Sequence, residues 1–198
     1  MDYFDDLLER IREIRTSERR YYQKVTDIYS ECSVDYDKNS EVTLTFFKTV
    51  QNIMHYAVSG QTAAEIVYHR SDAERPHMGL TTWKNAPNGR VIKSDVTVAK
   101  NYLSEKEVEE LNLLTTQYLD YAELQAKNHV LMTMSDWERA LNRFLEFNQL
   151  EVWVEKGTIS HQQAEEKAVA EYEKFRIIQD REIMSDFDQQ LKLLLNSK

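Results

Sequence analysis

The sequence is poor in the residues that interrupt helices, with four glycines and two prolines among 198 residues. That scarcity argues against a β-sandwich, which needs many turns. The 41% apolar residues are enough for a core, and the 30% charged residues fit a soluble helical protein better than a disordered tail. We therefore expect a mainly α-helical protein of one compact domain or two small ones.

Cysteine occurs once, at Cys32, which excludes an intrachain disulfide and a four-cysteine zinc site. The five histidines are scattered, and the zinc motif H-E-x-x-H is missing. The phosphate-binding loops G-x-x-x-x-G-K-[ST] and G-x-G-x-x-G and the hydrolase motif G-x-S-x-G are missing as well. The sequence thus predicts no metal and no cofactor, and Cys32 is expected to lie in the core.

Basic residues are also in the minority, because 25 lysines and arginines face 34 acidic residues and give a net charge of −9. Nucleic-acid surfaces need clustered cations, so we expect this chain alone to bind no nucleic acid. No apolar run approaches the roughly 18 residues of a membrane span, and the acidic N-terminus is unlike a signal peptide. These absences predict a soluble, cytoplasmic protein with no membrane association.

The N-terminal residues follow a heptad pattern, with apolar residues at steps of three and four and Glu18 as the exception. The apolar positions are Phe4, Leu7, Ile11, Ile14, Tyr21, Val25, Ile28 and Cys32. The pattern predicts a long helix over residues 1–33, followed by a helical domain over 34–198. Two interpretations stay open for this helix. It either pairs two chains as a coiled-coil arm or packs on its own domain. A separate alternative is that the helix is interrupted at Thr16-Ser17, which gives two shorter helices.

The coiled-coil interpretation predicts a homodimer. Its contacts would come from the first four apolar positions, which are Phe4, Leu7, Ile11 and Ile14.

Four capping boxes mark helix starts, each with a hydroxyl residue and a Glu or Gln three residues later that satisfy free backbone N–H groups. They are Thr62–Glu65, Ser71–Glu74, Ser104–Glu107 and Ser160–Gln163. Ser59-Gly60 predicts a helix end, because glycine takes the left-handed conformation there. With the apolar spacing, these signals predict a multi-helix bundle of about eight helices.

Residues 78–94 interrupt the helical pattern. Asn88-Gly89 favours a two-residue type I′ turn, and apolar residues on both sides predict a short β-hairpin flap near residues 80–92. Ser94 is then expected to begin a short helix. Free N–H groups at a helix start favour anions, so the segment is a candidate phosphate or carboxylate site. Its candidate ligands are Lys84, Arg90, Lys93 and Ser94. The alternative is a plain connector with solvated charges.

A second group of polar residues offers weak catalytic candidates, namely His55, Glu65, His69, Arg70 and Asp72. Glu65 and His69 are four residues apart, so they share one helix face and could divide acid–base work. Glu65 also has a local explanation as the capping partner of Thr62, which favours a structural role.

Several ordered blocks resemble the C-terminal region of the RhuM family of bacterial virulence-associated proteins, over almost the whole chain. They read "YFDDLLERIREIRTSERRYYQKVTDIY", "VQNIMHYAVSGQTAAEIVYHRSDA", "MGLTTW", "KSDVTVAKNYL" and "LDYAELQA". Members of that family usually have an N-terminal segment similar to a winged-helix or phage antirepressor DNA-binding module. This chain lacks it, so we expect a fragment of a longer DNA-binding protein or a short relative.

The resemblance implies no established catalytic residue, although related regions are joined to Fic/Doc-type domains. The tripeptide Asn88-Gly89-Arg90 matches the end of the Fic motif H-P-F-x-x-G-N-G-R, but the motif's histidine falls on Thr82, which rules out that active site. We therefore expect a non-enzymatic interaction or regulatory module of a virulence or mobile-element protein. The alternative is an enzyme acting on a nucleotide or another phosphate-bearing substrate beneath the flap.

Overall fold

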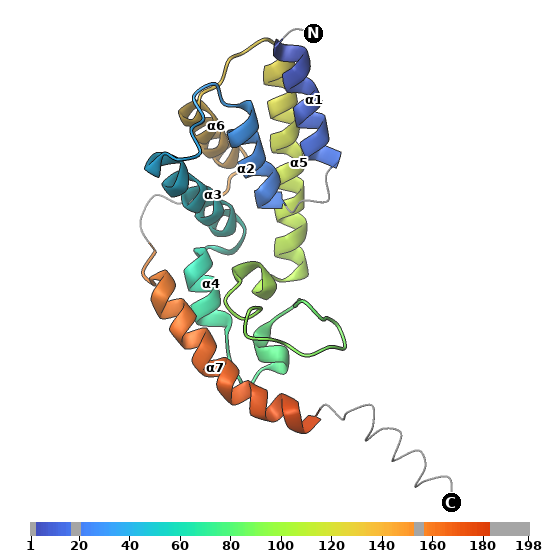
Figure 1. The fold of residues 1–198 in the computed structure, drawn as a ribbon, viewed down its shortest axis with the longest axis vertical. Coiled ribbons are helices and arrows are strands. Elements are labelled where there is room, and N and C mark those ends of the chain that lie inside the picture. The colour runs from blue at the N-terminus through green and yellow to red at the C-terminus, as the bar shows by residue number, and fades with distance from the viewer. Residues whose placement is uncertain (1–2, 17–20, 153–156, 183–198) are drawn as a thin grey trace, which may run out of the picture. The chain divides into compact units, whose positions relative to one another are not determined.

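The computed structural model describes residues 3–16, 21–152 and 157–182. These residues form seven α-helices and two short 3₁₀ helices, η1 and η2, and contain no β-strand (Figure 1). They divide into two compact units, each assembled from two separate stretches of chain. The mainly α-helical prediction is therefore confirmed.

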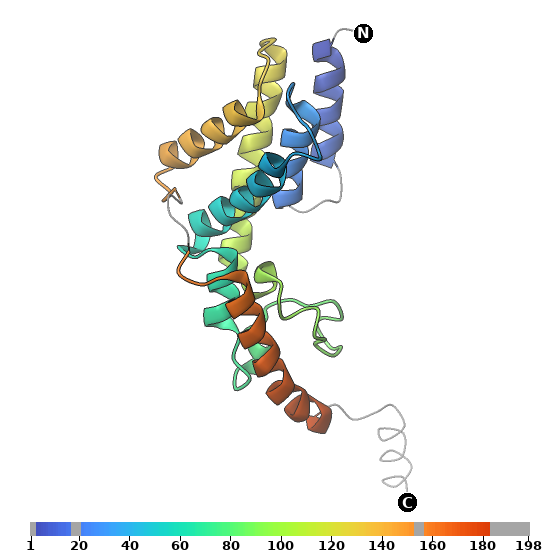
Figure 2. The same cartoon turned by 60° about the vertical axis from the view of Figure 1, so that its left-hand side comes forward.

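The first unit spans Met1–Ala63 and Ser104–Lys156. Its helices are α1 (Tyr3–Thr16), α2 (Tyr21–Cys32), α3 (Glu41–Ser59), α5 (Glu105–Lys127) and α6 (Met134–Phe147). The long helix α5 is the centre of this unit, because α1, α2 and α3 all pack against it. In both ribbon views, α1 runs beside α5 (Figures 1 and 2).

The single long helix expected over residues 1–33 is two helices in the structure, α1 and α2, which pack against each other. Leu7, Ile11 and Ile14 are buried within the chain. Two short helices can bury the same apolar stripe against α5 that a coiled-coil arm would offer to a partner. This result agrees with the interpretations of a split at Thr16-Ser17 and of packing within the chain.

The homodimer stays a prediction, as does the division into an arm over 1–33 and a domain over 34–198. Because Ile11 and Ile14 are buried, their replacement by Lys would destabilise the folded chain itself. Such variants are therefore unsuitable for testing self-association.

A buried polar cluster lies where α2, α5 and α6 meet. The hydroxyls of Tyr29 and Tyr118 both donate to the backbone carbonyl of Trp137, at 3.2 and 2.9 Å. Both tyrosines are fully buried, and burial raises the pKa of each well above its usual value. These phenols therefore stay neutral and act as structural donors within an aromatic core.

Cys32 lies in the same core, and burial raises the pKa of its thiol from 9.0 to about 12. We expect 5,5′-dithiobis(2-nitrobenzoate) to modify the folded protein at pH 8 at least about 100-fold more slowly than the urea-unfolded chain, because only about one thiol in ten thousand is ionised. Because folding raises this pKa, the neutral thiol contributes its full share to the free energy of unfolding below about pH 9. That contribution is lost as the pH rises toward 12. Equal modification rates of folded and unfolded protein would contradict the burial of this thiol.

The second unit spans Ala64–Leu103 and Gly157–Lys198. Its elements are α4 (Ala63–Arg70), η1 (Pro76–Gly79), η2 (Ala99–Tyr102) and α7 (His161–Glu182). Helix α7 packs against η1, and its buried face consists of Ala164, Ala168, Tyr172 and Phe175.

The predicted count of eight helices is wrong for the described residues. No helix starts at Ser71, whose hydroxyl is buried without a hydrogen-bond partner, and Asp72 instead accepts the Glu74 N–H at 2.9 Å. No α-helix starts at Ser94 either, because residues 93–97 form turns before η2. The short C-terminal helix expected around Phe187, Leu191 and Leu194 lies outside the described residues.

The predicted capping boxes at Ser104–Glu107 and at Ser160–Gln163 form. A capping box that was not predicted joins Thr133 and Asp136 at the start of α6. Gly60 ends α3 with φ of 66°, as expected.

The predicted β-hairpin is also wrong. The backbone groups of residues 83–92 bond to side chains of Asp95, Gln179 and Trp83, so they are not available for a ladder between two strands. The type I′ turn does not form, because neither Asn88 nor Gly89 has a positive φ. The chain reverses instead around a cis Ala86–Pro87 peptide, and the Gly89 N–H donates to the Asn85 carbonyl at 2.7 Å.

None of the helices in the described ranges combines the length and the hydropathy that crossing a bilayer requires.

Candidate functional site

Residues 80–98 form a loop, called the flap loop below, whose two sides are joined by the buried carboxylate of Asp95. Oδ1 accepts the Lys84 N–H at 3.1 Å, and Oδ2 accepts the Ile92 N–H at 2.9 Å. The Asp95 carbonyl accepts a third bond, from the Asn101 side chain at 2.9 Å. One aspartate therefore closes the loop by satisfying backbone donors that a strand pair would otherwise satisfy.

Helix α7 holds the other side of the flap loop through Gln179. The Gln179 amide accepts the Val91 N–H at 2.8 Å and donates to the Val91 carbonyl at 3.2 Å, and both residues are buried. Next to this pair, Arg90 forms an ion pair with Asp180 at 2.8 Å on the surface. These contacts fix the loop to the second half of its own unit.

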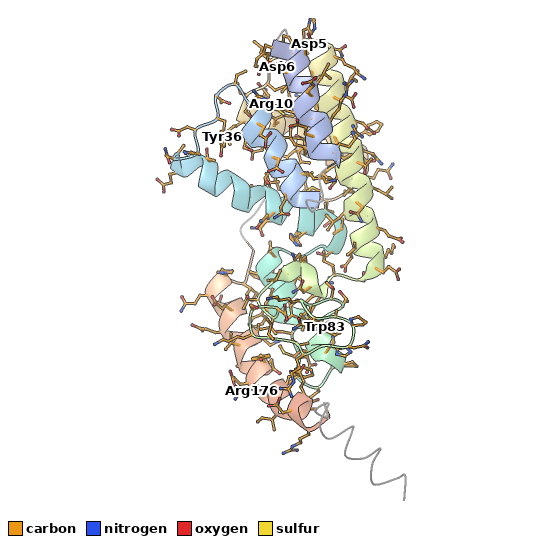
Figure 3. The ribbon with its side chains drawn as sticks, turned by 45° about the vertical axis from the view of Figure 1, so that its right-hand side comes forward. Asp5, Asp6, Arg10, Tyr36, Trp83 and Arg176 are labelled. Carbon is orange, nitrogen blue, oxygen red and sulfur yellow. The ribbon has the colours of Figure 1, made fainter. Side chains whose placement is uncertain are left out.

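The tip of the flap loop is packed around Trp83 (Figure 3). The indole Nε1 donates to the Gly89 carbonyl at 2.8 Å, and the ring lies 4.4 Å from that of His77. The ring of Trp83 is buried, so it fills the space beneath the turn.

A groove of about 590 Å³ lies beside this tip, between the flap loop, η1 and α7. Its lining residues are Ala73, Glu74, Arg75, Pro76, His77, Pro87, Asn88, Gly89, Phe175, Ile178 and Gln179. His77 and Met78 have φ of 50° and 63°, a strained conformation that is often found at functional sites. The ionisable side chains of the groove are Glu74, Arg75 and His77, and Arg75 also lies 3.6 Å from the carboxylate of Asp72. The groove could admit a small anionic ligand, and its mix of apolar and polar walls is typical of ligand sites.

The four anion-binding candidates do not converge on a helix start. Ser94 is exposed and lies in a turn, so the free N–H groups on which the prediction depended are not presented together. Arg90 is paired with Asp180, while Lys84 and Lys93 are exposed. Anion binding by these four residues stays a prediction.

The five catalytic candidates are divided between the two units. His55 lies on α3 in the first unit, and its Nδ1 contacts the Gln51 carbonyl at 2.7 Å. The other four belong to the second unit.

Each of those four has a local contact of its own. The Glu65 carboxylate accepts the N–H and the hydroxyl of Thr158, at 2.8 and 2.9 Å. Arg70 donates to the Tyr102 carbonyl at 3.0 Å, and Asp72 lies 3.6 Å from Arg75. His69 is exposed beside the ring of Tyr68. These contacts explain the residues structurally, and catalysis by them stays a prediction.

Sequence reasoning missed Asp95 and Gln179, which organise the flap loop. Asp95 follows Ser94 directly, and an aspartate in a turn-rich segment is a recognisable signal for side-chain bonds to nearby backbone N–H groups. Gln179 gives no such signal, because its partner Val91 is 88 residues away in the sequence.

Comparison with protein families matched the model described as "Virulence protein RhuM family" over residues 1–184. The chain belongs to the RhuM family. No curated protein and no solved structure matched this RhuM-family chain. The match confirms the resemblance seen in the sequence blocks. Within the described ranges, no three His, Cys, Asp or Glu side chains come close enough together to hold a metal ion.

Proposed function

We propose that this RhuM-family chain is a non-enzymatic helical module for interaction or regulation within a virulence or mobile-element protein. One observation supports this most directly: the polar groups at the base of the flap loop are bonded to their own chain. Asp95 is occupied by two backbone N–H groups, and Gln179 by both backbone groups of Val91.

An active site needs polar groups that converge on the substrate instead of on the protein. The flap loop uses its buried polar groups to hold itself on α7, which suits a structural connector. The first unit exposes several large apolar side chains, as expected for a surface that binds another protein. Leu113, Leu131 and Phe147 are the most exposed of them.

The groove beside the flap loop favours a second candidate function. It would be an enzyme or binding protein for a nucleotide or another phosphate-bearing substrate. Arg75 and His77 supply the groups that could contact a phosphate, and the strained backbone at His77 and Met78 is the kind of feature that occurs at ligand sites.

Thermal denaturation with inorganic phosphate, ATP or GTP, each with Mg²⁺, separates the two candidates. We expect no shift, because the proposal assigns the loop no ligand. A one-site ligand at 100 times its Kd would instead stabilise the protein by about 2.7 kcal/mol.

If a ligand does raise the melting temperature, two variants with combined substitutions identify where it binds. A shift that is lost in the combined Lys84→Gln, Arg90→Gln and Lys93→Gln variant would favour the predicted anion site. A shift that is lost in the combined Arg75→Gln and His77→Gln variant would favour the groove. Lys106→Gln, on α5 in the first unit, is the control and should leave any shift intact. Either loss would overturn the non-enzymatic proposal in favour of a ligand-binding one.

A further inference from the structure

A second groove, of about 570 Å³, lies within the first unit between the C-terminal half of α5, the connection to α6, and α6 itself. It is called the α5–α6 groove below. Its lining residues are Tyr121, Gln125, Val130, Leu131, Met132, Asp136, Arg139, Ala140, Arg143, Phe144 and Phe147. Apolar residues dominate this lining, and two arginines stand among them.

Two apolar side chains at the edges of this groove are open to solvent, since Leu131 is 60% exposed and Phe147 is 85% exposed. Trp137 and Leu141, earlier on α6, are buried, whereas Phe147 is not. It is the last residue of α6, where the helix leaves the core that covers its earlier turns. Isolated exposed apolar residues are common, but here they line one groove together.

The backbone that presents Leu131 is fixed by hydrogen bonds on both sides. The Val130 N–H donates to the Gln125 carbonyl at 3.0 Å, and His129 has the left-handed φ of 55° that ends α5. On the other side, the Met132 carbonyl accepts the Val34 N–H at 3.0 Å. Leu131 is thus held in an exposed position before any partner binds, which lowers the entropy cost of binding.

The charge of the groove is positive although the chain is acidic. The carboxylate of Asp136 accepts the N–H and the hydroxyl of Thr133, at 3.0 and 2.7 Å. It also forms an ion pair with Arg139 at 3.0 Å. Arg139 and Arg143 lie four residues apart on α6, and no carboxylate of the described residues pairs with Arg143. A guanidinium next to exposed aromatic and aliphatic side chains favours a partner that brings an apolar face with a carboxylate beside it.

We propose that the α5–α6 groove binds an amphipathic helix of another protein. Its apolar face would pack on Leu131, Phe144 and Phe147, and an acidic side chain would pair with Arg143. This inference rests on the proposed interaction function and names the surface and the partner chemistry. A helix suits the site because such grooves recognise apolar residues spaced at i, i+3, i+4 and i+7.

A second copy of the chain fits this groove less well than a foreign helix. A symmetric dimer through the groove would place the same patch on both sides, and Asp136, the carboxylate in that lining, is already bonded to Thr133 and Arg139, so the patch offers Arg143 no free carboxylate. The net charge of −9 adds repulsion between copies.

Two synthetic amphipathic peptides of about 18 residues, roughly 27 Å long as helices, test the proposal. Both have the same leucine and phenylalanine face, but one has Glu and the other Lys at the flanking positions. Fluorescence anisotropy of labelled peptide measures binding to the whole chain. The Glu peptide is expected to bind at least about tenfold more tightly than the Lys peptide, a difference of about 1.4 kcal/mol.

Surface variants then locate the binding. Arg143→Glu should reverse the preference between the two peptides. The combined Leu131→Ser and Phe147→Ser variant should weaken the Glu peptide by at least about tenfold. The matched controls are Leu113→Ser and Lys106→Glu, which change an exposed apolar and an exposed basic residue of α5 outside the groove. All five positions are exposed, so circular dichroism should show an unchanged fold.

Three results would overturn the inference. They are equal binding of both peptides, binding that Arg143→Glu leaves unchanged, and a dimer in light scattering that the Leu131 and Phe147 variant dissociates. The last result would assign the groove to a second copy. A phosphate or nucleotide effect at the flap loop would refute the non-enzymatic proposal and leave the peptide result in place, so the two failures are distinguishable.

Discussion

Replacement of Asp95 by Ala should lower the free energy of unfolding by about 3 kcal/mol, because it leaves the N–H groups of Lys84 and Ile92 without their carboxylate acceptor. An unsatisfied buried donor costs about 1–3 kcal/mol, and the two donors left here are partly buried, so each should contribute about half of that loss. Asp95→Asn keeps one acceptor oxygen and should cost about half as much. Urea unfolding followed by circular dichroism measures the loss, and faster hydrogen exchange at the two amides would assign it to the flap loop.

Asp180→Ala is the matched control for this experiment. Asp180 also holds the flap loop, through Arg90, but both side chains of this ion pair are about half exposed. Exposed ion pairs contribute about 0.2–1 kcal/mol, so this variant should stay close to the wild type. If the Asp95 variant were as stable as the Asp180 variant, the carboxylate of Asp95 would not be the group that closes the loop.

Replacement of Gly79 by Ala should destabilise the second unit by about 3 kcal/mol or more, through two effects that act together. Gly79 has φ of 80°, which residues with a Cβ adopt only at a cost. A Cβ at this position would also collide with the backbone carbonyl oxygen of Arg70, at the end of α4. A backbone atom at a helix end cannot move aside as a flexible side chain can. Thermal unfolding of the variant measures the sum.

Gly60→Ala separates the two effects, because it places a Cβ on a residue with positive φ but causes no collision with a neighbouring atom. Gly60 has φ of 66°, but a Cβ there would meet no atom within 4 Å. Its expected cost is about 1 kcal/mol, from the backbone conformation alone. Similar losses in the two variants would mean that the approach of Arg70 to Gly79 is not as close in solution.

The helices were predictable because their signals are local. Apolar spacing and capping pairs such as Ser104–Glu107 act within a few residues, and they act in the same way wherever the helix packs. The split of the N-terminal heptad into α1 and α2 was predictable only as one of several outcomes. Its stripe fits α5 as well as it fits a second chain, and only tertiary packing decides between them.

The flap loop was mispredicted because its bonding is not local. Asn88-Gly89 favours a hairpin turn in isolation, but the backbone of Val91 pairs with Gln179, and Asp95 takes the N–H groups that a ladder needs. Tertiary contacts of this kind override turn preferences. Apolar periodicity marks the side of a helix on which a residue lies, but not where along the helix the core ends, as the exposed Phe147 at the end of α6 shows.

The pairing of Gln179 with Val91 has a consequence for synthesis on the ribosome. Val91 is made 88 residues before its partner, which corresponds to about 4–18 s at 5–20 residues per second. During that interval the nascent flap loop has Asp95 but not α7, so one side of it can close while the other keeps its backbone bonded to water. The packing of the first unit is also delayed, because α1, α2 and α3 pack against α5, which is synthesised after them. Nascent chains halted before Gln179 should therefore expose the flap loop to proteases.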